Sequence, residues 1–100
     1  MVSHFDTTHI CERERVDYWV QLVCRFYPHA AGRRLKDAPF AAQLERTVLG
    51  AVEVSDIRCS ALRYERRMQD LRADESEDLL VSYMLEGEAQ LEQCGRVATL

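Results

Sequence analysis

The chain has 100 residues, of which 47% are hydrophobic and 30% are charged, with a formal net charge of −4 at pH 7. This length and composition are typical of one soluble globular domain with a modest core. No apolar run approaches the ~20 residues that a membrane span needs, and the polar N-terminus lacks a signal-peptide core, so we expect a cytoplasmic protein without membrane contact.

The first structured element is expected to be a helix. Residues 1–11 show no regular hydrophobic period and are interpreted as a loose arm, whereas residues 12–27 have a 3.6-residue period that predicts an amphipathic helix. We expect Pro28 to end the helix, because proline disfavours helical backbone in the residue before it. The apolar stripe of this helix contains Trp19, which we expect to be buried against the domain. A surface for a partner or a membrane is the alternative role of the stripe.

The helix is followed by a connection and a strand. Residues 29–39 are rich in basic side chains and end in Pro39, which indicates an irregular connection. Apolar residues then alternate from Phe40 through Leu44 to Val48, a period that predicts a strand. Gly50 is expected to turn the chain.

Two more strands are expected before an acidic loop. Apolar residues have one parity at Val52 and Val54 and the other at Ile57, so we expect a bulge near residues 55–56. The alternation of Leu62, Tyr64 and Met68 predicts a third strand. The acidic run at residues 72–78 indicates a solvated loop.

The C-terminal stretch predicts a long strand and a hairpin. Apolar residues alternate from residue 79 to residue 91, interrupted at Gly87, where we expect a bend. Cys94 and Gly95 are expected to form a tight turn, with Gly95 at positive φ, before a return strand at residues 96–100. The pattern as a whole predicts a mainly β fold of antiparallel strands with one N-terminal α-helix.

Few residues suggest chemistry. The four cysteines have no metal-type spacing, and we expect them to be small buried hydrophobic residues. His4, His9 and Cys11 resemble a metal cluster, but they fall in the expected arm and lack a fourth ligand, so we expect no metal or other cofactor. No nearby histidine activates Cys24 or Cys59 as a nucleophile. Five arginines could form a basic patch, but a solvated cross-strand face is favoured: Arg58, Arg63, Arg66, Arg67 and Arg72.

The order of several short motifs resembles one known family. The helical motif comprises Glu14-Arg15, Tyr18-Trp19 and Leu22 to Phe26, and it precedes Asp37-Ala38-Pro39-Phe40, Leu44 and Leu49-Gly50. The second motif comprises Arg72-Ala73-Asp74, Ser76, Asp78, Leu80, Ser82, Leu85, Gly87, Gln93, Gly95-Arg96 and Ala98 to Leu100. This arrangement is similar to the N-terminal, effector-sensing domain of AraC-type transcription regulators, which is a branch of the cupins.

The resemblance implies a partial cupin-like, jelly-roll β-barrel. We therefore expect residues 1–100 to form a single, C-terminally truncated domain with an arm at 1–11, a helix at 12–27 and strands at 40–100. Such a domain is non-catalytic, binds an unidentified small effector and mediates dimer contacts, so a homo-oligomer is expected. The family binds DNA through a separate helix-turn-helix part, and we expect no direct nucleic-acid binding by this chain.

Two alternatives remain open. A self-associating interaction module would need no ligand, and a cupin enzyme would need clustered imidazoles, although no histidine follows His29. The candidate residues of an effector pocket are Leu44, Tyr64, Arg66, Tyr83 and Leu85, with the inward-facing parity of each strand undecided. Residues expected to be structurally important are Trp19, Pro39, Phe40, Gly87 and Gly95.

Overall fold

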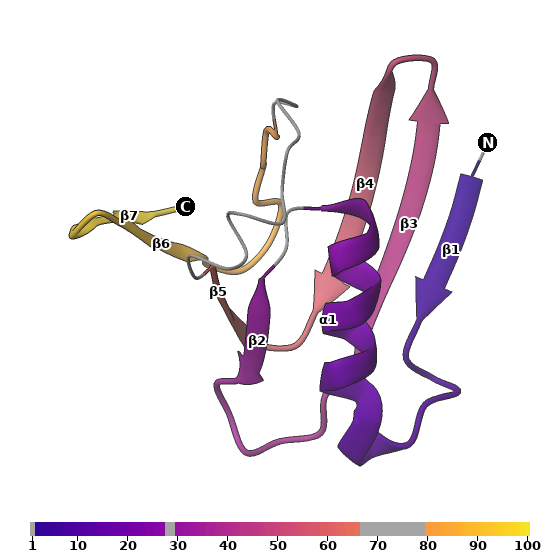
Figure 1. Ribbon diagram of the computed structural model, residues 1–100, viewed down its shortest axis with the longest axis horizontal. Helices are drawn as coiled ribbons and strands as arrows, with labels where there is room; N and C mark the ends of the chain where they lie inside the picture. The colour runs from indigo at the N-terminus through magenta and orange to yellow at the C-terminus, as the bar shows by residue number, and fades with distance from the viewer. Residues whose placement is uncertain (1, 28–29, 67–79) are drawn as a thin grey trace.

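The computed structural model describes residues 2–27, 30–66 and 80–100. In chain order the elements are β1 (Val2–Asp6), the 3-10 helix η1 (Glu12–Glu14), α1 (Arg15–Phe26), β2 (Ala31–Arg34), β3 (Ala42–Leu49), β4 (Val52–Cys59), β5 (Leu62–Glu65), β6 (Gln90–Gln93) and β7 (Arg96–Thr99). All strand pairs are antiparallel, and they form a sheet in the order β1-β3-β4 and two ribbons, β2-β5 and β6-β7. The predicted class, mainly β with one α-helix, is confirmed, and the described strands do not close a barrel (Figure 1).

The helix supplies one half of the core. Trp19 and Leu22 are the buried residues of α1, with exposed fractions of 0% and 4%, and they pack against Phe40, just before β3, and against Ala42 and Leu44 of β3. The predicted burial of Trp19 is therefore confirmed. The helix ends at Phe26, and the following residue already has extended backbone. Pro28, to which we attributed this end, lies outside the described residues.

The interpretation of residues 1–11 as a loose arm is wrong. The segment Val2–Asp6 is β1, which pairs along the edge of β3 with Phe5 opposite Leu44. The Phe5 ring also packs on Phe26 of α1, with ring centroids 5.5 Å apart. Local hydrophobic period could not reveal this strand, because its backbone partner lies about 40 residues away in the chain.

The irregular connection expected at residues 29–39 contains a strand. Ala31–Arg34 forms β2, paired with β5, which occupies part of the predicted third strand. Gly32 lets β2 approach α1 closely, because a Cβ atom at this position would lie 2.6 Å from Cγ2 of Val20. A short strand with two arginines and a glycine has no apolar alternation, so the sequence pattern missed it. Met68 and the acidic run at 72–78 lie outside the described residues.

The bulge expected in β4 is absent. Each residue of β3 from Ala42 to Leu49 faces one residue of β4, and the predicted turn at Gly50 is present with φ +64°. Val52 on one face and Ile57 on the other are 60% and 46% exposed. Because neither face of β4 is fully buried, the change of apolar parity requires no bulge.

The long strand expected at residues 79–91 is wrong for residues 80–89, and only its end, residues 90–91, belongs to a strand, β6. Residues 80–89 have no strand, and Leu80, Val81, Tyr83 and Leu85 are exposed. Alternation is not sufficient for a strand, since the backbone also needs a hydrogen-bonding partner. The hairpin is confirmed: Cys94 and Gly95 have φ of 52° and 77°, as a type I′ turn requires.

Candidate functional site

A polar contact joins the buried Trp19 of α1 to β5. The Trp19 indole Nε1 donates a hydrogen bond of 2.8 Å to the Tyr64 hydroxyl. The Tyr64 side chain remains 44% exposed, and its partial burial raises the pKa of Tyr64 to about 12, so the phenol is protonated at neutral pH. Since the hydroxyl oxygen accepts from Trp19, its own proton can be donated to an acceptor outside the core. Tyr64 is thus a partly exposed donor with a fixed orientation.

The cysteines do not form a reactive centre. Burial raises the pKa of the Cys59 thiol to about 11, and this thiol donates to the Ser60 carbonyl at 3.0 Å. A thiol with a raised pKa is a poor nucleophile at neutral pH. The expectation that all cysteines are buried is wrong, because Cys11, Cys59 and Cys94 are exposed and Cys24 is half-buried, although the Cys59 thiol itself is partly desolvated.

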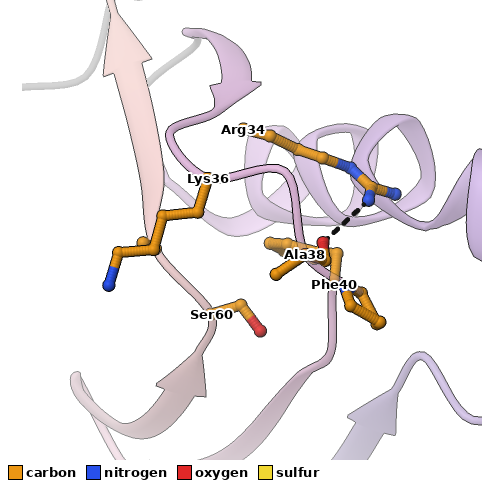
Figure 2. Close-up of a pocket in the computed structure, with 7 residues that line it drawn as sticks. Arg34, Lys36, Ala38, Phe40 and Ser60 are labelled. Atoms are coloured by element: carbon orange, nitrogen blue, oxygen red, sulfur yellow. Dashed lines mark hydrogen bonds between the residues drawn. The ribbon is translucent and has the colours of Figure 1, made fainter.

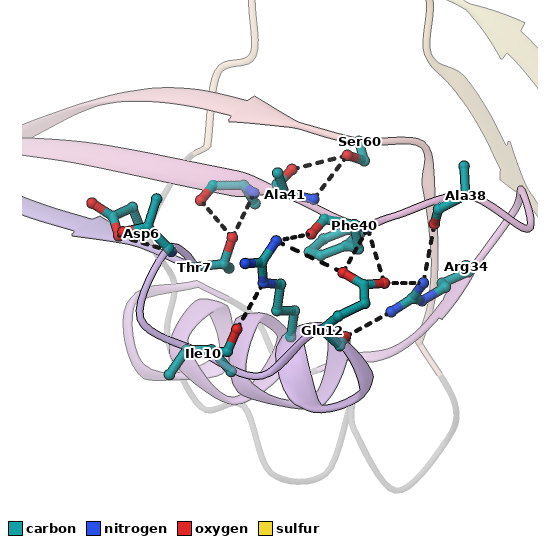
Figure 3. A network of polar contacts seen from close by, with 12 residues as sticks. Asp6, Thr7, Ile10, Glu12, Arg34, Ala38, Phe40, Ala41 and Ser60 are labelled. Carbon is teal, nitrogen blue, oxygen red and sulfur yellow. Dashed lines mark hydrogen bonds and ion pairs between the residues drawn. The ribbon is translucent and has the colours of Figure 1, made fainter.

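Next to the core, the Glu12 carboxylate organises a cluster of polar contacts (Figure 3). It accepts hydrogen bonds from the Phe40 amide at 3.1 and 3.2 Å, and it lies 2.5 Å from the Arg34 guanidinium. Arg15 approaches the same carboxylate at 3.7 Å. Desolvation opposes ionisation, but the Phe40 amide and the two arginines outweigh it, so the pKa of Glu12 lies below its ordinary value.

The two arginines extend this Glu12 cluster to backbone carbonyls. Arg34 donates to Ala38 at 3.0 Å and to the Glu12 carbonyl at 2.9 Å. Arg15 donates to Ile10 at 2.8 Å and to Phe40 at 3.0 Å. The cluster therefore ties the start of the helical region to β2 and to the chain that enters β3.

Polar side chains fix the end of β1 by hydrogen bonds. Thr7 is almost fully buried, with an exposed fraction of 1%, and its hydroxyl accepts the Ala42 amide hydrogen at 3.1 Å. Asp6 accepts hydrogen bonds from the Thr8 hydroxyl at 2.6 Å and the Thr8 amide at 3.0 Å. These bonds, with smaller contributions from His4 and His9, lower the pKa of Asp6 to about 2.

Asp6 should make stability depend on pH in the acid range. The folded-state pKa of about 2 lies below the ordinary value of 3.8, so the stabilisation is complete above pH 3.8 and is lost as the pH falls towards about 2. We expect Asp6→Asn to unfold more easily than the parent at pH 6 and to match it near pH 2. Urea unfolding at a series of pH values measures this.

A matched control is Asp37→Asn, because in the described part of the chain Asp37 makes no hydrogen bond or ion pair. An equal pH dependence of unfolding for the parent and Asp6→Asn would contradict the assignment.

The structure separates the predicted pocket residues. Leu44 is fully buried in the core, whereas Tyr83 and Leu85 are 85% and 78% exposed in the segment before β6. Tyr64 contacts Trp19, and Arg66 lies directly after β5. The five residues are therefore not brought together around a cavity in the part of the chain that we describe, and Tyr64 is the member with a defined polar role.

The residues expected to be structural have distinct positions. Trp19 and Phe40 are buried in the core, Pro39 is exposed beside Phe40, and Gly87 and Gly95 adopt positive φ. Sequence reasoning missed Glu12, Arg34 and Thr7. Their partners are 22 to 35 positions away, so no local spacing signals these contacts.

Metal binding and membrane insertion were also considered for the described residues. Within residues 2–27, 30–66 and 80–100, no three His, Cys, Asp or Glu side chains are grouped so as to hold a metal ion. His4 and His9 approach Asp6 at 3.1 and 3.8 Å. No helix in these same ranges has both the length and the apolar character needed to cross a bilayer.

Comparison with known proteins gives two matches. Residues 19–100 match the family model of the AraC-binding-like domain. The whole chain is 24% identical to a protein of Bacillus sp. (strain OxB-1) described as "Uncharacterized protein in nit 5'region", and it spans 39% of the length of that relative. No solved structure matches the chain significantly.

Proposed function

The chain belongs to the AraC-binding-like domain family, and from this membership we propose that it is a non-catalytic, effector-sensing domain of an AraC-type bacterial transcription regulator. The observation that carries the proposal is the family match, which extends from Trp19 in α1 through β7. The one α-helix and the antiparallel strands of the described residues are consistent with a partial cupin-like domain. DNA binding in such regulators belongs to a separate helix-turn-helix part, and we propose none for this chain.

The Trp19–Tyr64 contact supports a sensing role. Tyr64 offers a phenol proton at the surface, and its oxygen is bonded to the buried indole of Trp19. An effector with a carbonyl or ether oxygen would accept a hydrogen bond from this phenol. Because the same hydroxyl accepts from Trp19, effector binding would affect the contact between β5 and α1. Ligand binding can then shift the conformational equilibrium of the domain.

Ligand binding is expected to stabilise the folded chain. At a concentration 100 times the Kd, a ligand adds about 2.7 kcal/mol to the free energy of unfolding, which raises the Tm of a domain of this size by roughly 10–20 °C. Thermal melts with a panel of small metabolites, read by the emission of the single tryptophan, measure this. We expect Tyr64→Phe to weaken the response, because it removes the donor and keeps the ring.

Self-association is a second candidate function, favoured by β4. Only one edge of β4 is paired among the described strands, and Val52, Val54 and Ile57 are 60%, 52% and 46% exposed. Unpaired strand edges with exposed apolar side chains favour association between chains. Sedimentation at several concentrations tests this: a concentration-dependent mass without any ligand-induced stabilisation would favour an interaction module over a sensor.

A further inference from the structure

The connection after β2 borders a small pocket, but its charged side chains do not converge. Figure 2 shows Lys36 and Arg34 pointing to opposite sides of the chain at residues 36–40. The Arg34 guanidinium is already paired with the Glu12 carboxylate. No ligand can therefore be held by both cations of this pocket.

The face of the β2–β5 ribbon that points away from α1 carries another pocket. Gly32 lies close to Val20 of α1. Tyr64, directly opposite Gly32, bonds to Trp19, so both residues mark the face towards the helix. Because side chains alternate along a strand, the neighbours of Gly32 and Tyr64 in sequence point to the other face. There a pocket with a volume of about 70 Å³ is lined by Ala31, Gly32, Arg33, Arg63 and Glu65.

Two arginines face one another in this ribbon pocket. Arg33 and Arg63 are directly opposite in the register of the ribbon, which places their Cβ atoms about 5 Å apart. Neither makes an ion pair or a hydrogen bond with the residues that the structure describes. Like charges directly opposite one another in a sheet are destabilising. A bound anion would relieve this repulsion.

Glu65 adds one negative charge to the same pocket. It lies two positions beyond Arg63 on β5, about 7 Å along the strand, and opposite Ala31, whose small side chain leaves space beside it. Within residues 2–27, 30–66 and 80–100, Glu65 has no ion-pair partner. The ribbon pocket thus presents two cations at one end and one carboxylate at the other.

We infer that the ribbon pocket binds a small zwitterion of the α-amino acid class, with its carboxylate at Arg33 and Arg63 and its ammonium at Glu65. Guanidinium groups donate paired hydrogen bonds to a carboxylate, and a carboxylate accepts from an ammonium. An anion without an ammonium would lie beside the unpaired Glu65 carboxylate, and an amine without a carboxylate would face two arginines. The volume of about 70 Å³, a little more than two water molecules, limits the enclosed part of the ligand to its charged groups and Cα.

Tyr64 connects the ribbon pocket to the proposed sensing function, on which this inference rests because it names the class of effector. Arg63 and Glu65 flank Tyr64 on β5, and the Tyr64 hydroxyl accepts from Trp19 on the other face of the ribbon. A ligand held by both Arg63 and Glu65 restrains the backbone on both sides of Tyr64. Amino acid binding should therefore change the emission of Trp19, the single tryptophan of the chain.

The test is an NMR titration of the ¹⁵N-labelled full chain with unlabelled glycine near neutral pH. We expect saturable shifts of the amide signals of Gly32, Arg63 and Glu65, with a Kd on the order of 1 mM for so small a ligand. Acetate lacks the ammonium group of glycine, and glycinamide lacks its carboxylate. At constant ionic strength each should bind about fivefold more weakly than glycine, because each loses one charged contact.

Three variants separate the charges of the ribbon pocket. Arg63→Gln should raise the Kd for glycine about tenfold, because it removes a charge-assisted contact, and should not lower the Tm, because it also removes a like-charge repulsion. Glu65→Gln should weaken glycine binding and strengthen acetate binding, and a merely structural effect would not change the two in opposite directions. Arg58→Gln is the matched control, because it removes an exposed charge of β4 that does not line the pocket, and it should change either Kd by less than about twofold.

The inference and the sensing function can fail separately. Absence of saturable glycine shifts, acetate binding as tight as glycine binding, or equal weakening by Arg63→Gln and Arg58→Gln would overturn the inference. If glycine saturates the pocket signals and leaves the Trp19 emission unchanged, the pocket is correct and sensing through it is not. If another ligand class stabilises the chain while glycine moves none of these signals, sensing stands and the amino acid pocket is wrong.

Discussion

Trp19→Ala is expected to lower the free energy of unfolding by about 3–5 kcal/mol, the usual cost of truncating a buried large aromatic side chain. Trp19 has an exposed fraction of 0%, and it packs with Leu22, Phe40 and Leu44 in the core. The substitution also removes the indole donor to Tyr64. Small domains are stable by only about 5–15 kcal/mol, so the variant should melt with reduced or lost cooperativity.

Two milder variants separate packing from hydrogen bonding at this site. Trp19→Phe retains much of the apolar surface, and Tyr64→Phe leaves the buried indole N–H without its acceptor, which costs about 1–3 kcal/mol. If both remove the same bond, their effects in the double variant should not add. A Trp19→Ala protein as stable as the parent would contradict the packing of the helix on the core. Strongly red-shifted tryptophan emission from the native parent protein would contradict it as well.

Leu44→Ala is expected to cost about 2–5 kcal/mol, because a large-to-small change at a closed core site leaves a cavity. Leu44 is fully buried in β3, belongs to the same core cluster as Trp19 and lies opposite Phe5 of β1. Urea unfolding provides the measurement. Leu85→Ala is the matched control, since Leu85 is 78% exposed and its truncation should change stability by less than about 0.5 kcal/mol.

The same pair of variants tests the role of Leu44. The sequence suggested that Leu44 and Leu85 both line an effector pocket, whereas the structure places one in the core and the other at the surface. Equal, small stability losses in the two variants would favour the pocket interpretation over the core position.

The elements predicted correctly are those whose signal is local. The helical stripe around Trp19, the turn at Gly50 and the turn at residues 94–95 each depend on side chains within a few positions of one another. β1 and β2 were missed because their stability comes from the backbones of β3 and β5, and their own side chains have no suitable alternation. Conversely, residues 80–89 alternate well and form no strand.

The candidate site, likewise, could be predicted only where its signal is local in the sequence. The sequence predicted Tyr64 to be a strand residue and a candidate of the effector pocket, but its hydrogen bond to Trp19 joins positions 45 residues apart. The contacts of Glu12 with Arg34 and the Phe40 amide likewise span 22 and 28 positions. Side chains of opposite charge are too common in the sequence for such a pairing to be chosen without the fold.

The central claim is that the chain binds an effector and does not convert it. Equilibrium dialysis of the full chain against the ligand that raises its Tm most tests this claim most directly. Mass spectrometry then quantifies the ligand on both sides of the membrane. The proposed sensing function predicts saturable binding of one ligand per chain, with all of the ligand recovered chemically unchanged. Conversion of the ligand beyond the molar amount of protein would contradict a non-catalytic sensor and would favour an enzyme.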